Sequence, residues 1–205
     1  MRDECYRVCS LAMKLPNVFG FSKRETVAIL TILAVLIVAL SVNLKIAVRK
    51  RRDAQRKSDI REIQVALGKY YDDFGFIPLS SENGEIKACL PKEGPVKNEK
   101  GSPIFVACKW GLDKLADQGD PNYPAYMEKL PRDPSAGQGF EYFYLSNGKD
   151  FQLFAALEGK SEAEYDPKIE ARGIVCGTKL CNFGLASFDL PLDKTLEEYE
   201  NKLDE

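Results

Sequence analysis

The sequence predicts an α+β protein in which one long amino-terminal helix spans a membrane with its first half and packs its second half on a small antiparallel β-sheet. Three observations predict this fold class. Residues 26–44 form an uncharged apolar run, apolar residues recur at helical spacing between Ile60 and Tyr71, and alternating aromatic residues flank Asn147-Gly148. With 205 residues, a net charge of −2 and 44% hydrophobic residues, the chain outside the membrane suffices for one modest core.

The apolar run is long enough to cross a bilayer. No residue from Thr26 to Leu44 carries a charge, and at about 1.5 Å per residue the run extends roughly 28 Å, close to the roughly 30 Å of a hydrocarbon core. A secretory signal is cleaved after its apolar part, whereas the plausible processing point here, between Gly20 and Phe21, precedes it. Cleavage there would remove residues 1–20 as a leader and keep the helix.

A single acidic residue, Glu25, stands at the start of this membrane helix. An unpaired carboxylate in lipid costs several kcal/mol or is neutralised, so we expect Glu25 to need a cationic partner. The free amino group that cleavage creates on Phe21 could supply that partner. Lys23 and Arg24 are the alternative, because they could neutralise Glu25 within one chain.

Gly20, Phe21 and Glu25 resemble the amino-terminal motif of a known family, the type IV pilins and the pseudopilins of type II secretion. The similarity covers about half of the chain and continues in the segments 52–61, 66–67, 70–71, 78 and 130–134. The chain departs from the family at Ser22, Lys23 and Arg24, where a Thr and two apolar residues are usual.

The resemblance implies a pilin fold, a processing route and an assembly. A prepilin peptidase would cleave between Gly20 and Phe21, Phe21 would be N-methylated, and Glu25 would pair with the amino terminus of a neighbouring subunit. The implied partners are further copies of the chain in a filament, the peptidase, and the inner-membrane assembly machinery of a pilus or secretion system. The chain would be a single-pass membrane protein before assembly and part of a cell-surface or periplasmic filament afterwards.

Several alternatives stay open from the sequence. The junction also fits a plain single-pass anchor that is never processed. Subunits of type IV pili, secretion pseudopili and competence pili share this amino-terminal motif, so the sequence does not tell which of these assemblies the chain would form. It also does not tell whether the chain would be a major or a minor subunit. Translation from Met13 instead of Met1 would give a compact leader, residues 13–20.

The cysteines beyond the leader are Cys89, Cys108, Cys176 and Cys181, and the chain contains no histidine. Zinc sites usually use closely spaced Cys-x-x-Cys pairs or histidines, and neither occurs. A disulfide framework formed in an oxidising compartment is the simpler interpretation. Four cysteines allow three pairings, of which loop economy favours Cys89 with Cys108 and Cys176 with Cys181. Buried free thiols in a reducing cytosol are the alternative.

The charges that follow the membrane run favour the opposite orientation. Lys45 and residues 49–52 follow it closely, so the positive-inside rule would place the carboxyl-terminal domain in the cytoplasm. We give the cysteines more weight and expect an extracytoplasmic domain. The basic segment from Lys45 to Lys57 includes Asp53 and no aromatic residue, so we expect it to contact anionic headgroups and neighbouring subunits rather than nucleic acid.

The sequence predicts five segments: a leader (1–20), the membrane half of the helix (21–45), the soluble half of the helix (46–75), a loop-and-sheet region (76–191) and an acidic tail (192–205). The helix should extend from Glu25 to about Phe74. Its apolar stripe consists of Ile60, Ile63, Leu67, Tyr70 and Tyr71, and its opposite face carries Arg61, Glu62, Gln64 and Lys69. The tail is expected to be a frayed helix or disordered, and we assign it no site.

Beyond Pro78 the sequence predicts a long loop as far as Gly139, with a short strand at 104–108 and a short helix at 110–116. The strongest strand signal is a hairpin of 140–145 and 151–157 around Asn147-Gly148, because Asn-Gly supplies the positive φ angles that tight hairpins need. A second short pair is expected at 174–176 and 181–186.

Asp117, Asp120 and Asp133 were candidate calcium ligands, but they lack the regular oxygen-ligand spacing of a calcium loop, so we expect no metal and no other cofactor. The sequence also has no histidine, nucleophile elbow or phosphate-binding glycine loop, which argues against an enzyme. It predicts a structural subunit. The leading rival is a non-polymerising, membrane-anchored extracytoplasmic binding protein whose specificity would lie in the exposed loops.

Overall fold

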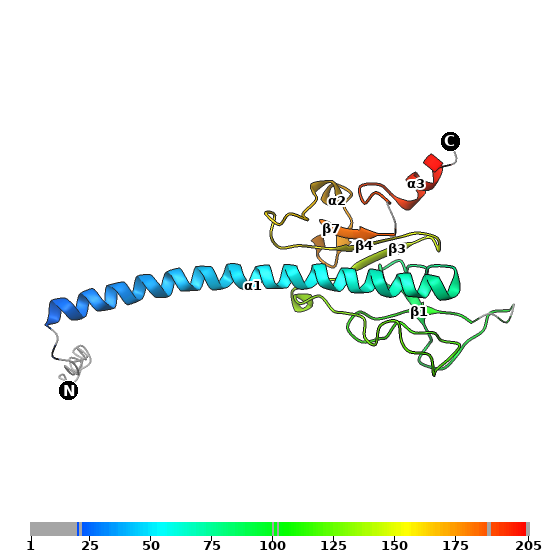
Figure 1. Ribbon diagram of the computed structural model, residues 1–205, viewed down its shortest axis with the longest axis horizontal. Coiled ribbons are helices and arrows are strands. Elements are labelled where there is room, and N and C mark those ends of the chain that lie inside the picture. Colours follow the sequence, from blue (N-terminus) through cyan, green and yellow to red (C-terminus); the bar gives the residue numbers. More distant parts are fainter. Residues whose placement is uncertain (1–19, 21, 100, 102, 188–189, 204–205) are drawn as a thin grey trace, which may run out of the picture. The chain divides into compact units, whose positions relative to one another are not determined.

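The computed structural model describes residues 20, 22–99, 101, 103–187 and 190–203 of the chain (Figure 1). It divides into two compact units, Met1–Ile46 and Ala47–Glu205. The class is α+β, as predicted, with one long apolar amino-terminal helix and small antiparallel sheets.

Helix α1 extends over Lys23–Phe74, which confirms the helix expected from Glu25 to about Phe74. It ends at Gly75, whose φ of 72° is the left-handed conformation that commonly terminates helices. The Gly75 N–H donates to the Tyr71 carbonyl at 2.8 Å. The chain then turns back, since the Ile77 N–H donates to the Gly148 carbonyl at 2.8 Å.

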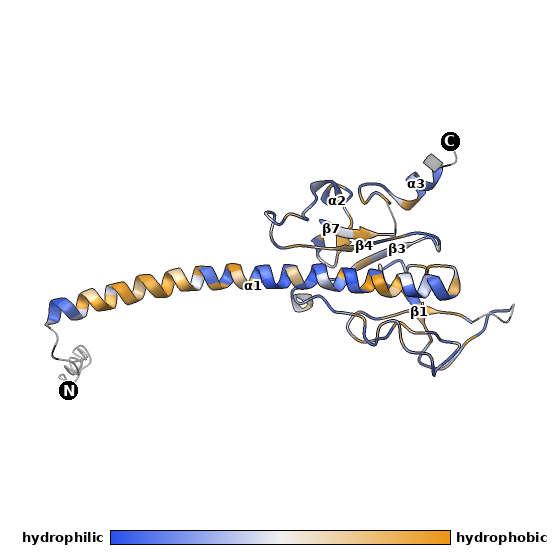
Figure 2. Ribbon diagram, viewed as in Figure 1, coloured by the Kyte–Doolittle hydropathy of each residue, from blue (hydrophilic) through white to orange (hydrophobic). Residues whose placement is uncertain are grey.

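In the first unit, the apolar part of α1 has no protein to pack on. Every residue from Val27 to Leu44 is exposed, and the run is seen as the long hydrophobic stretch of α1 in Figure 2. By length and composition, α1 is a helix that could cross a membrane, and none of its most apolar window is buried. Contiguous exposed apolar surface of this extent is stable only in lipid or against other apolar helices.

In the second unit, α1 presents a buried face to the domain. Ile60, Ile63 and Leu67 are fully buried and Tyr70 is nearly so. Tyr71, which the sequence placed in the same stripe, is instead 38% exposed. The rotation of about 100° per residue carries Tyr71 off the stripe that Tyr70 occupies.

The opposite face of α1 agrees with the prediction. Arg61, Glu62 and Lys69 are exposed, and Gln64 is half-buried at the edge. The Gln64 side-chain amide donates to the Ala186 carbonyl at 2.8 Å, so this residue ties α1 to the central sheet.

The central sheet has three antiparallel strands in the order β3 (Phe143–Ser146), β4 (Phe151–Ala155) and β7 (Phe183–Ala186). The β3–β4 hairpin confirms the strongest strand prediction, with Ser146 opposite Phe151. In its turn the Asn147 Oδ1 atom accepts from the N–H groups of Lys149 and Asp150, at 3.0 and 2.8 Å.

Both faces of this sheet are covered, so all of β4 is buried. Tyr142, Tyr144 and Leu153 belong to the main core that contains the buried face of α1. Phe154 belongs to a second, smaller core with Ile169 of the short helix α2 (Pro167–Ala171). The aromatic alternation predicted for 140–144 is confirmed, since Tyr142 and Tyr144 are buried and Glu141 is exposed.

The region between Pro78 and Gly139 differs from prediction in two respects. The strand expected at 104–108 is the shorter β2 (Val106–Ala107), which pairs with β1 (Lys87–Cys89), a strand that the sequence did not predict. The helix predicted at 110–116 is absent, because its backbone groups bond elsewhere. The Gly111 N–H donates to the Leu130 carbonyl at 2.9 Å, and Leu115 pairs with Met127.

The carboxyl-terminal strand pair is also rearranged. The strand β5 (Val175–Cys176) pairs with β6 (Lys179–Leu180), whereas β7 pairs with β4. The predicted partners at 174–176 and 181–186 are therefore strands of two different sheets. The glycine at 177, with a φ of 77°, forms the tight turn between β5 and β6.

The tail forms a helix, α3 (Leu196–Leu203), that starts with a reciprocal cap. The Thr195 N–H donates to Glu198 at 2.9 Å, and the Glu198 N–H donates to the Thr195 hydroxyl at 3.1 Å. Asn147 donates to Glu200 at 2.9 Å, and Gln152 donates to the carbonyls of Pro191 and Lys194 at 2.8 Å. These acidic residues therefore have structural contacts, beyond the solubilising role that composition alone indicated.

Two disulfides confirm the pairing that loop economy favoured, Cys89 with Cys108 and Cys176 with Cys181. The first joins β1 to the end of β2, and the second closes the β5–β6 hairpin.

Removal of the two disulfides should have unequal effects. The bridged cysteines are separated by 19 residues in the first disulfide and by 5 in the second. From the chain-entropy relation, replacing Cys89 and Cys108 with Ala should lower the free energy of unfolding by about 3 kcal/mol, and replacing Cys176 and Cys181 should lower it by about 2 kcal/mol. Urea unfolding of the two double variants in detergent, without reductant, measures this order. A larger loss for the Cys176–Cys181 variant would contradict it.

Candidate functional site

The predicted processing point lies just ahead of the start of α1. Gly20 is exposed and has a φ of 34°, and the helix begins at Lys23. Gly20 therefore precedes the helix, which begins three residues later. Phe21, the residue predicted to become the methylated amino terminus, lies outside the described residues.

Glu25 forms a reciprocal cap with Ser22 at the start of α1. The Ser22 N–H donates to Glu25 Oε2 at 2.7 Å, and the Glu25 N–H is 3.4 Å from the Ser22 hydroxyl. This is the S-x-x-E capping box, in which two backbone donors of the first turn are satisfied by side chains. The sequence carries this signal as Ser22-Lys23-Arg24-Glu25, and the charge of Glu25 alone does not reveal it.

The cap adds a contact that the sequence analysis did not include, and the predicted cationic partner of Glu25 stays a prediction. Glu25 has a hydrogen-bond partner within its own chain, although no cation neutralises it: neither Lys23 nor Arg24 forms an ion pair in the described part of the chain. The Oε1 atom of Glu25 has no partner among the described hydrogen bonds. A second partner, such as an amino group, can therefore be added without breaking the cap.

A second polar site, which we call the Arg56 cluster, joins α1 to the domain. It consists of Arg52, Asp53, Arg56, Asp133 and Glu158. Arg56 is completely buried. Its guanidinium donates through Nε and Nη2 to both oxygens of Asp133, at 2.8 and 3.0 Å, and through Nη1 to Asp53 at 2.8 Å and Glu158 at 2.9 Å.

The remaining acceptors of the Arg56 cluster are also satisfied. Asp53 accepts from the backbone N–H groups of Glu158 and Gly159, at 2.9 and 3.0 Å, and Arg52 donates to Glu158 at 2.7 Å. The Arg56 guanidinium also lies over the Phe140 ring, 4.6 Å from its centroid. A buried ion cluster is tolerated only when its members are paired in this way.

The pKa values reflect this pairing. Hydrogen bonds from Arg52 lower the pKa of Glu158 to about 2, against the effect of partial burial, and Arg56 adds to the lowering. Burial alone would lower the pKa of Arg56, but its bonds to Asp133, Glu158 and Asp53 raise it above its ordinary value.

The Arg56 cluster changes the interpretation of the basic segment from Lys45 to Lys57. Its carboxyl-terminal members are used inside the domain, since Lys57 also pairs with Glu162 at 3.1 Å and Glu164 at 2.9 Å. Arg52, Arg56 and Lys57 are thus not available for headgroups or neighbouring subunits. For Lys45 and residues 49–51, contact with headgroups and neighbouring subunits stays a prediction.

The three candidate calcium ligands do not form a site. Asp133 binds Arg56, while Asp117 and Asp120 accept from the N–H groups of Gly119 and Asn122, at 2.7 and 2.9 Å, as ordinary turns. Within the described residues no group of three or more acidic or cysteine side chains is arranged to hold a metal.

The pKa of Glu158 predicts a loss of stability in acid. The folded-state pKa of about 2 lies below the unfolded value of about 4.3. The stabilisation of the folded state by ionised Glu158 is therefore complete above pH 4.3 and is lost as the pH falls toward 2. The free energy of urea unfolding should therefore fall more steeply between pH 5 and pH 2 for the wild type than for Glu158→Gln. Equal slopes would show that Glu158 is not the group whose protonation matters.

Comparison with protein-family models, with curated proteins and with solved structures finds no match to this chain. We therefore infer its function from the geometry described above and from the resemblance of its amino-terminal motif.

Proposed function

We propose that the chain is a structural subunit of a type IV pilus or of a type II secretion-like pseudopilus. In this role a prepilin peptidase removes residues 1–20, Phe21 becomes the methylated amino terminus, and the subunits polymerise through the apolar half of α1. The role is structural and requires no catalysis or cofactor. The folded domain forms the outer surface of the filament.

One observation carries the proposal: the apolar half of α1 is exposed from Val27 to Leu44, it follows closely on an exposed Gly20, and Glu25 in the first turn is its only acidic residue. Lipid covers such a helix in a monomer, and neighbouring apolar helices can cover it in a filament. The Oε1 atom of Glu25, which has no partner among the described residues, is where a neighbouring amino terminus would bind. Such a contact would offset the cost of a carboxylate among apolar helices.

The two disulfides support the location of the domain. Disulfides persist in oxidising compartments, so we place the second unit outside the cytoplasm and the chain, before assembly, as a single-pass membrane protein. The assembly machinery of the inner membrane and the peptidase are its proposed partners, together with further copies of the chain.

Mass spectrometry of the native amino terminus tests processing. The expected mature chain begins at Phe21 and is one methyl group heavier than its sequence. A Gly20→Ala control tests the recognition residue and should reduce processing. Recovery of only the intact chain, with residues 1–20 attached, from cells that contain an active prepilin peptidase would contradict the proposal.

One observation favours the second candidate, a membrane-anchored binding protein that never polymerises. The Ser22–Glu25 cap gives the carboxylate a partner within one chain, so a monomer does not need a neighbour to satisfy it. A protein of this kind would keep its anchor and show no contact between apolar helices of different copies.

A further inference from the structure

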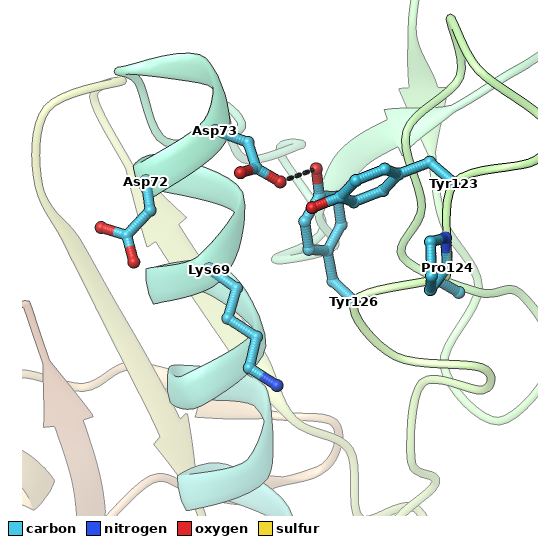
Figure 3. A pocket seen from close by; sticks show the side chains of 7 residues that line it. Lys69, Asp72, Asp73, Tyr123, Pro124 and Tyr126 are labelled. Carbon is cyan, nitrogen blue, oxygen red and sulfur yellow. Dashed lines mark hydrogen bonds between the residues drawn. The ribbon is translucent and has the colours of Figure 1, made fainter.

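A groove of about 340 Å³ lies between the last turns of α1 and the loop that carries Tyr123 and Tyr126 (Figure 3). The Asp73 carboxylate points toward the hydroxyl ends of Tyr123 and Tyr126, and the Tyr126 hydroxyl donates to its Oδ2 atom at 2.7 Å. The two ring centroids are 5.8 Å apart, and Tyr123 is 44% exposed. A carboxylate close to an exposed tyrosine is the chemistry that binds an organic cation.

The surroundings of the groove add negative charge. Asp72 and Asp73 occupy the last turn of α1, which has no basic residue and already carries the negative end of the helix dipole. Partial burial raises the pKa of Tyr126, and Asp73 and Asp117 raise it further, as expected where nearby charge is negative. Two carboxylates at this end of a helix are unfavourable for the isolated helix, so a cation bound there would relieve the repulsion.

Lys69 is the cation that lines the groove. It forms no ion pair with Asp72 or Asp73 in the part of the chain that the structure describes. With Asp72, Asp73 and Asp117 nearby, the groove keeps a negative balance despite Lys69.

Unpaired cations lie elsewhere in the second unit, on the stretch of α1 that we call the 49–51 segment. Lys50 and Arg51 are exposed and have no side-chain hydrogen bond or ion pair among the described residues. The Nε atom of Arg49 is buried and has no hydrogen-bond partner in the part of the chain that the structure describes. Arg52, Arg56 and Lys57, which follow, are occupied by acidic residues of the same domain.

We propose that the groove of one copy receives the 49–51 segment of a second copy, with Arg51 placed between Asp73 and the Tyr123 ring. Along α1, Lys50 and Asp72 are separated by about 22 residues, or roughly 33 Å of helix, so one copy cannot fill its own groove. The contact joins two different surfaces and can repeat from copy to copy without closing. This inference rests on the proposed function, because it identifies the domain contact of the same assembly.

Two pairs of cysteine substitutions test the contact in the full-length chain in its native membrane. Arg51→Cys on one tagged copy and Tyr123→Cys on a second should give a mixed-tag disulfide dimer after mild oxidation, and neither variant alone should give one. Val35→Cys lies in the apolar half of α1 and is 68% exposed, so its cross-linking reports helix contacts between copies independently.

The two readouts separate the two proposals. Val35 cross-links without the 51–123 cross-link would overturn this inference and leave the proposed function in place. The 51–123 cross-link without processing at Gly20 would support the contact and contradict the pilin-like role. Absence of both cross-links would overturn both.

Charge reversal tests the chemistry of the contact. Changing Lys50 and Arg51 to Glu, or Asp72 and Asp73 to Lys, should lower the yield of the domain contact roughly tenfold, and combining the two reversals should restore it. The controls are exposed residues elsewhere in the domain, changed so that the net charge changes by the same amount: Lys92 and Lys97 to Glu, or Glu82 and Glu93 to Lys. These changes should have no effect on the yield of the domain contact.

A single substitution in the groove tests its preference for a cation. Lys69→Gln removes the competing positive charge and should raise the yield of the 51–123 cross-link. A lower yield, or no recovery when the two reversals are combined, would overturn the assignment of the groove to a cationic segment.

Discussion

Replacing Glu25 with Ala is expected to stop filament assembly while the processed chain stays in the membrane. Loss of a buried charge pair costs about 3–5 kcal/mol, and each 1.4 kcal/mol is about a tenfold change in an equilibrium, so assembled material should fall by roughly a hundredfold or more. Membrane insertion should not suffer, since Ala removes the only acidic residue from the membrane-spanning half of α1. Sheared filament fractions and membrane fractions, compared by immunoblot, measure both quantities.

The Ser22–Glu25 cap makes the matched controls informative. Glu25→Gln can still accept from the Ser22 N–H but carries no charge, whereas Ser22→Ala removes the hydroxyl that contacts the Glu25 N–H and keeps the charge. If pairing with a neighbouring amino terminus drives assembly, Glu25→Gln should fail like Glu25→Ala, and Ser22→Ala should assemble. Assembly by Glu25→Gln would instead identify Glu25 as a helix cap and contradict the pairing.

Replacing Arg56 with Ala should give the largest loss of stability in the folded domain. Arg56 is fully buried, and its removal leaves Asp53 and Asp133 buried without their cation. Breaking a buried pair in this way costs about 3–5 kcal/mol. The free energy of unfolding, measured by urea titration of the full chain in detergent with tryptophan fluorescence, should fall by that amount.

Two variants of Arg56 and its neighbourhood separate charge from geometry. Arg56→Lys keeps the charge but cannot donate to both oxygens of Asp133 and to Asp53 at once, so its loss should be intermediate. Arg61→Ala removes an exposed arginine five residues further along α1 and should change stability by less than about 0.5 kcal/mol. Equal effects of Arg56→Ala and Arg61→Ala would show that the Arg56 cluster does not stabilise the domain.

Features with local causes were predictable. The apolar run, the end of α1 near Phe74 and the hairpin at Asn147-Gly148 follow from residue types and spacings within a few positions of each other, so composition and periodicity suffice. The disulfide pairing was predictable for a similar reason, because both bridges close short loops. The Ser22–Glu25 cap belongs to the same group, and it was overlooked although its four residues are consecutive.

Features that depend on distant residues were not predictable. Arg56 meets Asp133 and Glu158, which follow it by 77 and 102 residues, and no local pattern distinguishes this buried arginine from exposed Arg51 or Arg61. The pairing of β7 with β4 and the absence of a helix at 110–116 have the same origin. In both segments the backbone groups form hydrogen bonds with residues that are distant in the sequence.

The sequence by itself determined that the chain has an apolar helix able to cross a membrane, an acidic residue at the start of that helix, and four cysteines positioned for two short loops. The tertiary structure alone decided which cations of the basic segment are used within the domain and which stay exposed. The physical reason is desolvation: a charge becomes part of a core only where folding brings enough opposite charges and hydrogen-bond partners to replace water, and those partners come from distant parts of the chain.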